Sequence, residues 1–298
     1  MIINLHKHGQ LCNRLFYTAH LYICAKVNGH TLVDFGLHEY MEYLESPTPY
    51  FFSFPALQAK VFRSWRVYKA LLFFYHSLEK FASEIKYSPI RKINHSQLLE
   101  EMDAEKYLSH FSGSGIYFCE GWVPKEKLPL EKFREEIKTI IKPKKEFLVN
   151  VDKISADLYS RYELLVGIHL RRGDYREYRN GEYFFEDEEY KNFMTAFKAN
   201  FPPEKKIVFV MCSNEKISAD HFGETDCYIA QGNPIEDLYL LSRCNYIMGP
   251  PSTYSAWASY VGNKPLFVID RSFNKPLPEH FKVCNDRHYA YFHLQNYY

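Results

Sequence analysis

The sequence lacks the two features that would carry a chain into or across a membrane. Its longest apolar runs, such as residues 70–75, are far too short to span a bilayer. Its first ten residues, MIINLHKHGQ, contain neither the apolar core nor the cleavage site of a signal peptide. From these absences we expect a soluble protein of the cytoplasm.

The sequence also lacks paired cysteines. Its seven cysteines are odd in number and scattered, and no C-x-x-C occurs. Disulfide frameworks and cysteine zinc sites have recognisable spacings, whereas a cytosolic protein keeps its thiols reduced. We therefore expect reduced thiols, in agreement with a cytoplasmic location.

A large net charge is missing as well. The chain has 37 Lys and Arg against 36 Asp and Glu, which gives a formal net charge of +1. Such a chain has no bulk electrostatic attraction for nucleic acid, so we expect no nucleic-acid partner. Any bound anion has to be held by a local site.

Three common phosphate-binding motifs are absent. No G-x-x-x-x-G-K-[ST] occurs, which excludes a P-loop kinase, and no G-x-G-x-x-G follows the first expected strand, which argues against a dinucleotide oxidoreductase. No D-x-D occurs either, and we interpret the acidic run 186–189 as the solvated start of a helix. The sequence therefore predicts no metal site, and arginines have to neutralise any bound diphosphate.

The second half of the sequence contains apolar strands that alternate with helices. The alternation from 160 to 280 has the spacing of a parallel sheet, which predicts a Rossmann-like α/β domain. Its expected strands are 164–170, 207–211, 227–230, 246–248 and 266–269. Its expected helices are 186–201, a short one from about Ser213, one opened by Asn233, and 252–261 closed by Gly262.

The first half repeats this pattern more loosely. Its expected strands are 2–5, 31–35 and 115–119, and its expected helices are 12–27, one through 65–72, 124–141 and 147–161. Residues 36–62 contain three prolines and are expected to be irregular, and 142–145 is the expected linker. We therefore predict two α/β domains, 1–150 and 151–298, that face each other across a cleft.

Polar residues follow the apolar strand 164–170 in the stretch GIHLRRGDY. In an open parallel sheet, ligands bind beyond the carboxyl ends of the strands. Arg171 and Arg172 there offer planar donor forks that suit phosphate oxygens. The alternative is a solvated pair of arginines, with Asp174 as the ion-pair partner of one of them.

Two further helix starts carry candidate donor contacts. Ser252 and Thr253 follow the strand 246–248, where backbone N–H groups and hydroxyls form a ready anion site or simply an N-cap. Asp237 lies near the start of another helix, where a carboxylate can accept from guanine N1 and N2 or complement the helix dipole. The turn from Gly9 to Arg14 leads from the first strand into a helix.

Four segments in the same order resemble glycosyltransferase family 11, the α-1,2-fucosyltransferases. HLRRGDY matches the H-x-R-R-G-D-Y motif of that family in full, and GQLCNRLFYTAH is similar to its Gly-Gly-Leu-Gly-Asn-Gln segment. IYFCEGW and IEDLYLLSRCNYIMGPPSTYSAWASY resemble two further family segments. The resemblance extends from about residue 9 to about residue 270.

The resemblance implies a GT-B fold, GDP-fucose as the donor, inversion at the anomeric carbon, and neither metal nor cofactor. It implies a galactose-containing glycan as the acceptor, which in bacterial enzymes of this kind is often lipid-linked, and leaves the oligomeric state open. Arg171 would hold the β-phosphate of the leaving GDP, supported by His169 and Arg172. The other implied donor contacts are Ser252 and Thr253 to the phosphates, Asp237 to guanine, Asn13 to the diphosphate or fucose from the opposite domain, and Ser213 and Asn214.

The sequence departs from the family pattern at three places, of which one, Tyr254 in place of a Phe, is expected to be neutral. Cys12 and Arg14 replace a usual Gly and Gln, which affects the shape of that turn. Residues 212–215, Cys-Ser-Asn-Glu, replace a common Phe-Ser-Asp-Asp, which affects the donor contacts of Asn214 and Glu215.

The proton acceptor for the acceptor hydroxyl is not identified by the sequence. Asp174, Glu177 and Glu182 follow the arginines and are the candidates. Alternative functions are a related transferase with another linkage or GDP-sugar, a nucleotide-sugar-binding protein without turnover, and an adhesion module that uses residues 172–174.

An aromatic stripe precedes and enters the helix through 65–72. Phe62, Trp65, Tyr68 and Leu72 share one helical face, and Arg63, Arg66 and Lys69 lie beside it. The pattern fits packing in the N-terminal core, and alternatively a weak peripheral contact with the inner membrane face.

Overall fold

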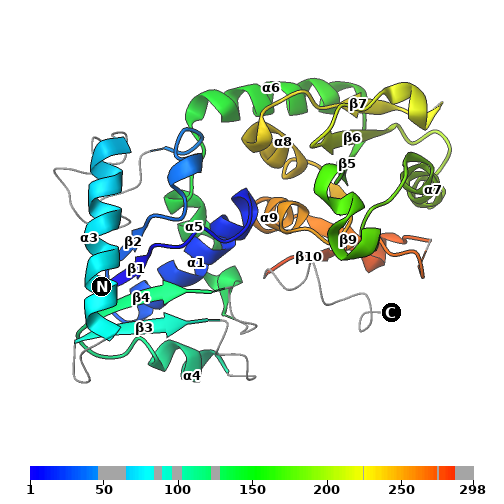
Figure 1. Ribbon diagram of the computed structural model, residues 1–298. Helices are drawn as coiled ribbons and strands as arrows, with labels where there is room; N and C mark the ends of the chain where they lie inside the picture. The colour runs from blue at the N-terminus through cyan, green and yellow to red at the C-terminus, as the bar shows by residue number, and fades with distance from the viewer. Residues whose placement is uncertain are drawn as a thin grey trace. The chain divides into compact units, whose positions relative to one another are not determined.

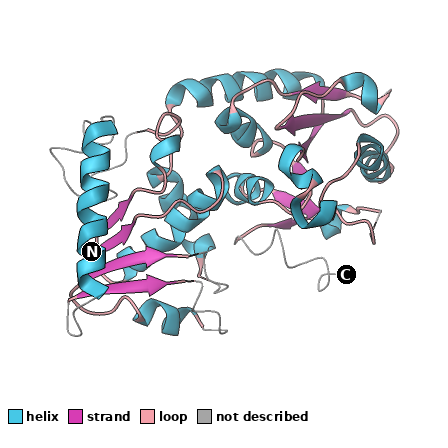
Figure 2. Ribbon diagram, in the orientation of Figure 1, coloured by secondary structure: helices cyan, strands magenta, loops and turns pink. Residues whose placement is uncertain are grey.

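The computed structural model describes residues 1–45, 65–83, 89–95, 103–121, 128–223, 225–273 and 275–285. The chain forms two compact units, Met1–Pro143 (unit 1) and Lys144–Tyr298 (unit 2). Each unit is an α/β structure with its own largely parallel sheet, as Figures 1 and 2 show. Helix α6 (Lys145–Arg161) begins within the expected linker 142–145.

The sheet of unit 1 has four parallel strands in the order β2-β1-β4-β3. Its strands are β1 (Ile2–Asn4), β2 (Leu32–Asp34), β3 (Ile90–Asn94) and β4 (Ile116–Glu120). In a parallel sheet all carboxyl ends lie at one edge, so the ends of β1, β3 and β4, at Asn4, Asn94 and Glu120, gather there. Strand β3 was not anticipated, because its sequence, IRKIN, has only two apolar residues and exposes Arg91 and Lys92.

The helices of unit 1 are α1 (Leu11–Val27), α3 (Trp65–Ser83), α4 (Ala104–Ser109) and α5 (Arg134–Ile140). The 3₁₀ turns are η1 (His38–Tyr40) and η2 (Leu130–Phe133). Asn28 and Gly29 end α1 as expected, with Gly29 at φ +67°. The short α4 was missed, and part of the helical tract expected over 124–141 lies outside the described residues.

One face of α3 packs on the sheet of unit 1. Leu71, Leu72 and Leu78 contact a core that includes Ile3 and Phe118. Leu72 therefore lies on the core side. Phe62 and Arg63 of the expected stripe lie outside the described residues, as do the side chains of Trp65 and Tyr68. Among the described helices, none combines the length and the apolar run that crossing a bilayer requires.

The sheet of unit 2 has six strands in the order β10-β9-β8-β5-β6-β7, all parallel except β10. The strands are β5 (Leu164–Leu170), β6 (Ile207–Ser213), β7 (Cys227–Ile229), β8 (Tyr246–Gly249), β9 (Pro265–Val268) and β10 (Lys282–Val283). Every residue of β5 is buried, as its continuous apolar sequence predicts. The short antiparallel β10 was not anticipated.

The helices of unit 2 are α6, α7 (Asp187–Lys198), α8 (Pro234–Leu241) and α9 (Thr253–Gly262). Its 3₁₀ turns are η3 (Gly173–Arg176), η4 (Tyr178–Gly181), η5 (Ala219–Phe222) and η6 (Pro278–His280). Tyr190 and Phe193 of α7 pack in the same core as Val166 and Ile168 of β5. On the opposite face, a Cβ added at Gly167 would lie 2.7 Å from Leu241 of α8. Helices therefore cover both faces of β5.

Of two local helix predictions in unit 2, one is confirmed and the other is wrong. The helix signal at residues 233–236 is confirmed, because Asn233 caps α8, Pro234 is its first residue, and Glu236 completes a capping box. The short helix expected from Ser213 is wrong, because β6 continues through Ser213 and the chain then forms only the 3₁₀ turn η5. Helix α9 includes Gly262, and Asn263 takes the left-handed position beyond it.

Candidate functional site

The carboxyl end of β5 places His169 and the two arginines in alternating directions. Successive side chains along an extended strand point to opposite faces. The backbone stays extended at Arg172, with φ −115° and ψ −156°. His169 and Arg171 therefore share one side of the sheet, whereas Arg172 lies on the side of α7.

His169 is a buried, neutral ring. Its exposed fraction is 3%, and burial, reinforced by the nearby charge of Arg171, lowers the pKa of His169 to about 3. Its ring lies 4.9 Å from that of Tyr254, and its Nδ1 has no hydrogen-bond partner among the described residues. A Cβ at Gly249 would lie 2.9 Å from His169 Cβ, so this approach requires glycine. His169 can thus offer a hydrogen bond, but no charge.

Arg171 is held in place by two neighbours. Its Nη2 lies 2.7 Å from Asp174 Oδ1, and its guanidinium lies over the ring of Tyr175, 5.2 Å from the centroid. Tyr175 in turn donates its hydroxyl to the carbonyl of Pro251, at 2.8 Å. Only 15% of the Arg171 side chain is exposed, so the guanidinium is fixed before any ligand binds.

The side chain of Arg172 is buried in the interior of unit 2. Its exposed fraction is 5%, and its guanidinium donates to the carbonyl of Phe185 and to the carboxylate of Asp187 in the first turn of α7. The rings of Phe184 and Tyr190 flank it. These contacts make Arg172 an anchor between β5 and α7 and leave Arg171 as the more accessible of the two arginines.

The residues after β6 support the loop that carries the arginines. Asn214 Oδ1 accepts from the backbone N–H of Arg172 at 2.7 Å, and Ser213 Oγ accepts from the N–H of Glu215 at 3.2 Å. Glu215 forms a two-pronged ion pair with Arg176, at 2.8 and 3.0 Å. Ser213 and Asn214 thus make loop contacts close to the arginine motif.

Helix α9 begins with two buried hydroxyl residues. Ser252 is the N-cap, and its Oγ accepts from the N–H of Tyr254 at 3.2 Å. Thr253 follows as the first helical residue, and both side chains are buried. No acidic residue lies in the first turn of α9, in contrast to α8. The positive end of this helix dipole is therefore not balanced by a carboxylate of its own first turn.

Asp237 lines a pocket of about 180 Å³ between α6, α8 and the end of β7. The other lining residues include Asn150 and Ile154 of α6 and the segment Ala230–Gly232 after β7. Asp237 Oδ1 accepts from the N–H of Gly232 at 3.1 Å. Burial, opposed by this N–H and reinforced by Glu236, raises the pKa of Asp237 to about 6. A buried carboxylate in a pocket this small suits a flat group with N–H donors.

Asn13 belongs to unit 1 and lies in the first turn of α1. Gly9 at φ +67° brings the chain so close that an added Cβ would lie 2.5 Å from Asn13 Nδ2. Asn13 Oδ1 is buried without a hydrogen-bond partner among the described residues. Arg14, which replaces a usual Gln, is tied to the carbonyl of Gly36 and to the carboxylate of Glu39.

Unit 2 therefore holds nine of the ten predicted site residues, and Asn13 lies in the other unit. The nine are His169, Arg171, Arg172, Asp174, Ser213, Asn214, Asp237, Ser252 and Thr253. Glu177 and Glu182 flank η4 and are exposed. Sequence reasoning gave no site role to Tyr175, treated Tyr254 as a neutral replacement, and placed Asp187 in a solvated helix start, whereas all three contact the motif through tertiary packing.

Comparison with known proteins gives the family. The model of glycosyltransferase family 11 matches residues 3–276. No match was found among curated proteins.

Several solved structures share the fold. The crystal structure of NodZ α-1,6-fucosyltransferase soaked with GDP-fucose is 15% identical, with 92% of this chain and 99% of that chain covered and a TM-score of 0.54. NodZ from Bradyrhizobium is 12% identical, with the same coverage and a TM-score of 0.53. A variant of Arabidopsis thaliana FUT1 in complex with GDP is 11% identical, with 96% and 74% covered and a TM-score of 0.58.

These structural likenesses, at low identity, show the fold, which is that of the GT-B fucosyltransferases. The match of the family model over nearly the whole chain shows the family. The chain is therefore a glycosyltransferase, and it belongs to glycosyltransferase family 11.

Proposed function

We propose that this protein transfers fucose from GDP-fucose to a hydroxyl of a glycan, with inversion and without a metal ion. The observation that carries the proposal is the fixed guanidinium of Arg171 at the carboxyl end of β5, supported by Asp174 and Tyr175. A pre-oriented, permanently charged group is what a leaving diphosphate requires. The GT-B fold and the family membership agree with this chemistry.

The donor-binding roles divide by chemistry among the residues of unit 2. Asp237, as a carboxylate, accepts from N1–H and N2–H of guanine in the pocket beside α8. The acid-free start of α9, with Ser252 and Thr253, binds phosphate oxygens through backbone N–H groups and hydroxyls. The role implied for Asn13 of unit 1, a contact with the diphosphate or with fucose, stays a prediction. Arg172, Ser213 and Asn214 hold the arginine loop in shape.

In the transfer step, the acceptor oxygen attacks C1 of fucose while the bond from C1 to the diphosphate oxygen breaks. GDP leaves with the bonding electrons, and Arg171 stabilises the charge that develops on the β-phosphate. The hydroxyl proton passes to a carboxylate. Because Asp174 is paired with Arg171, we assign Asp174 to orienting that guanidinium, and Glu177 and Glu182 remain the candidate proton acceptors.

We propose an α-1,2 linkage to galactose, on the full match of HLRRGDY to the motif of the α-1,2-fucosyltransferases. The structural neighbours include an enzyme named as an α-1,6-fucosyltransferase, so the linkage needs its own test. Incubation with GDP-fucose and a panel of galactosides, followed by NMR of the product, reports both acceptor and linkage. A product linked at another position would correct the linkage and leave the donor chemistry intact.

The second candidate function is nucleotide-sugar binding without turnover. It is favoured by the loop 212–215, in which Asn214 and Glu215 make internal contacts. Release of GDP that depends on an acceptor separates the two functions. Binding of GDP-fucose with no such release would favour the binding protein.

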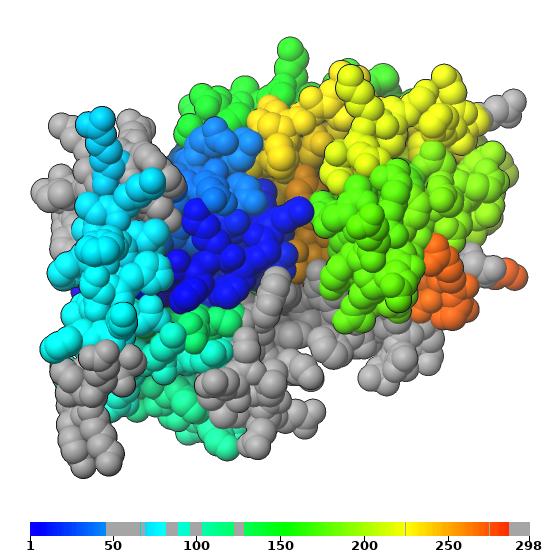
Figure 3. All heavy atoms as spheres, in the orientation of Figure 1, coloured from blue at the N-terminus to red at the C-terminus, as the bar shows by residue number. Residues whose placement is uncertain are grey.

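We also propose that the enzyme works in the cytoplasm, with weak contact to the inner membrane face through α3, where a lipid-linked acceptor would be presented. All seven cysteines are free, which fits a reducing compartment. Phe73 and Phe81 of α3 are exposed beside the exposed basic residues Lys69 and Lys80. Figure 3 shows the cyan atoms of α3 at the surface of unit 1. Apolar and basic groups together suit an anionic lipid surface.

A further inference from the structure

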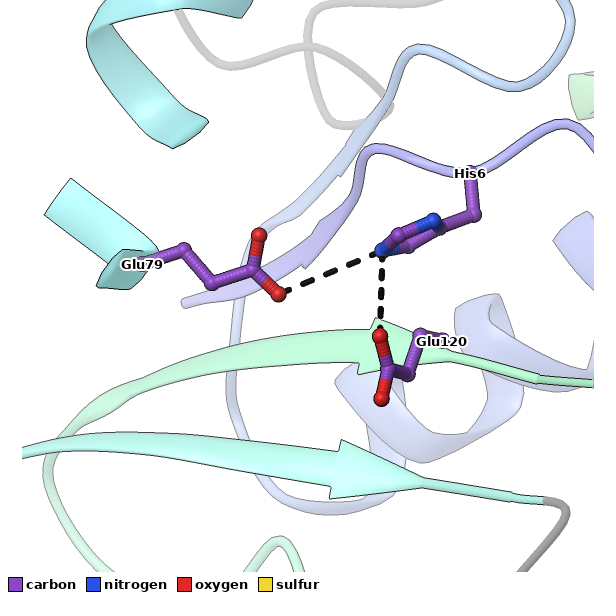
Figure 4. A group of neighbouring side chains, drawn as sticks. All are labelled: His6, Glu79 and Glu120. Carbon is purple, nitrogen blue, oxygen red and sulfur yellow. Dashed lines mark ion pairs between the residues drawn. The ribbon is translucent and has the colours of Figure 1, made fainter. Parts of the chain in front are cut away.

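Three side chains that are distant in the sequence meet at the carboxyl edge of the sheet in unit 1. His6 follows β1, Glu120 is the last residue of β4, and Glu79 reaches in from α3 (Figure 4). His6 Nε2 lies 3.5 Å from Glu120 Oε2 and 4.0 Å from Glu79 Oε1. The ligand atoms of the three residues all lie within 4.8 Å of one another.

The remaining oxygen of each carboxylate is held by another side chain. Asn94 Nδ2 donates to Glu120 Oε1 at 2.9 Å, and His76 Nδ1 lies 3.3 Å from Glu79 Oε2. The other two oxygens are therefore directed at His6 Nε2, which has no hydrogen-bond partner among the described residues. Outer partners that orient ligand oxygens in this way are typical of metal sites.

A cation already occupies part of this arrangement. Lys92 Nζ lies 2.8 Å from Glu120 Oε2 and 3.2 Å from Glu79 Oε1, the same two oxygens that face His6. The Lys92 side chain is 45% exposed and comes from β3, an edge strand. Its ammonium can therefore move into solvent at little cost. Two carboxylates with one ammonium leave the cluster one negative charge in excess, which a dication in place of the ammonium would balance.

We propose that His6, Glu79 and Glu120 bind a divalent transition metal of the zinc class, which displaces the ammonium of Lys92. One imidazole nitrogen and two carboxylate oxygens are the donor set that zinc accepts, and the nitrogen disfavours Mg²⁺ and Ca²⁺. Tetrahedral zinc with bonds of 2.0–2.1 Å places its ligand atoms about 3.3 Å apart. His6 and Glu120 are already close to that spacing, at 3.5 Å, whereas the Glu79 oxygen lies 4.0 Å from His6 Nε2 and within 4.8 Å of Glu120, so it has to approach both. Three protein ligands leave a position open for a further oxygen.

The site shares no residue with the proposed donor site, since its ligands are His6, Glu79 and Glu120. Its test therefore needs no GDP-fucose, and failure of the transfer proposal would not affect the result. The full-length chain, without a histidine tag and stripped of metal, is titrated with Co²⁺ by visible absorption and with Zn²⁺ by calorimetry. We expect one metal ion per chain.

Variants identify the ligands. His6→Ala and Glu120→Gln should each weaken binding at least about 10-fold, since even outer partners contribute 10- to 100-fold. Lys92→Met should tighten binding, because the competing ammonium is gone. Lys142→Met is the matched control, because the Lys142 side chain has a similar exposure and a similar ion pair, with Glu45 at 2.9 Å. The affinity of this variant for metal should equal that of the wild type. Circular dichroism checks the fold of each variant, and the conservative Glu120→Gln keeps the test valid if His6→Ala does not fold.

Three results would overturn the proposal. One is a wild-type chain that binds no metal, even if Lys92→Met binds it, because the native ion pair would then exclude the ion. Another is unchanged affinity in both His6→Ala and Glu120→Gln. The third is a thiolate charge-transfer band in the Co²⁺ spectrum, which would place the metal on cysteine.

Discussion

The ring of Tyr254 lies 4.9 Å from the ring of His169, while its hydroxyl donates to the carbonyl of Pro234 at 2.7 Å. One side chain at the start of α9 thus contacts the end of β5 and the first residue of α8. The arginine motif, the acid-free helix start and the Asp237 pocket belong to these three elements. Their spacing is consequently fixed by packing before a donor binds.

We expect Arg171→Ala to lower the transfer rate by at least about 10²-fold, because the β-phosphate would lose its charged partner. Arg171→Lys should restore little, since an ammonium cannot reproduce a planar two-pronged contact. Initial rates of GDP release measure both. Arg161→Ala removes an exposed ion pair at the end of α6 and should leave the rate unchanged. Wild-type activity in Arg171→Lys would contradict the assigned role.

GDP should bind equally well with and without a chelator, because arginine and a helix start take the place of a metal. Calorimetry of the metal-stripped chain in saturating chelator, compared with the same chain in Mg²⁺, provides the measurement. Loss of GDP binding in chelator would mean that a metal bridges the diphosphate.

The affinity for GDP should fall as the pH drops through about 6. Asp237 must be ionised to accept two guanine donors, and the pKa of this buried carboxyl is raised to about 6. Titration of GDP between pH 5 and pH 8 gives the midpoint. Asp237→Asn should bind GDP weakly at every pH, and a wild-type pH profile in this variant would assign the titration to another group.

The same carboxyl should destabilise the folded protein at neutral pH. The pKa of this carboxyl is 3.8 in the unfolded chain and about 6 in the folded protein. Its contribution to folding stability is therefore complete below pH 3.8 and is lost as the pH rises through about 6. Asp237→Asn should therefore raise the free energy of unfolding at pH 7.5 by up to about 3 kcal/mol. The melting temperature at that pH should rise accordingly. The difference from wild type should shrink at pH 4, and a lower melting temperature at pH 7.5 would contradict this account.

Gly249→Ala should displace His169 and destabilise unit 2. The new Cβ would lie 2.9 Å from His169 Cβ and 3.0 Å from its carbonyl oxygen, and backbone atoms cannot yield as a flexible side chain does. We expect a loss of about 1–3 kcal/mol in the free energy of unfolding, measured by urea denaturation. Gly29→Ala is an instructive comparison, because its φ of +67° is strained although nothing lies within 4 Å of the added Cβ.

Membrane contact through α3 should depend on both charge and aromatic groups. In flotation with vesicles, the wild type should associate with anionic and not with neutral lipid. Phe73→Ser with Lys69→Glu should abolish the association. Equal recovery of the wild type and this variant in the lipid-free fraction would leave α3 with a packing role alone.

Much of unit 2 could be predicted from sequence, because a strand buried on both faces has a continuous apolar sequence and because α8 begins with a complete set of capping signals. Strand β3 escaped notice because it is an edge strand with exposed Arg91 and Lys92. The helix expected from Ser213 failed because the extended pairing of β6 with β5 continues to Leu170 and overrides the local turn signal.

The resemblance implied that Arg171 holds the β-phosphate and that Arg172 supports it, but the structural role of Arg172 was beyond the sequence. Both look alike in HLRRGDY, and only the packing of α7 shows that Arg172 has a partner in Asp187. The cluster of His6, Glu79 and Glu120 was equally hidden, because no local spacing relates residues from three elements. Contacts of this kind arise from topology rather than from neighbouring residues.

The opposite orientations of the two arginines have a consequence for random mutagenesis of this motif. Variants at position 171 should accumulate at normal levels and fail in turnover, whereas variants at position 172 should be degraded, because they leave Asp187 and the start of α7 without their internal cation. A library that scores abundance and activity separately would therefore divide two adjacent, chemically identical residues into different phenotypic classes. Activity alone would not distinguish them.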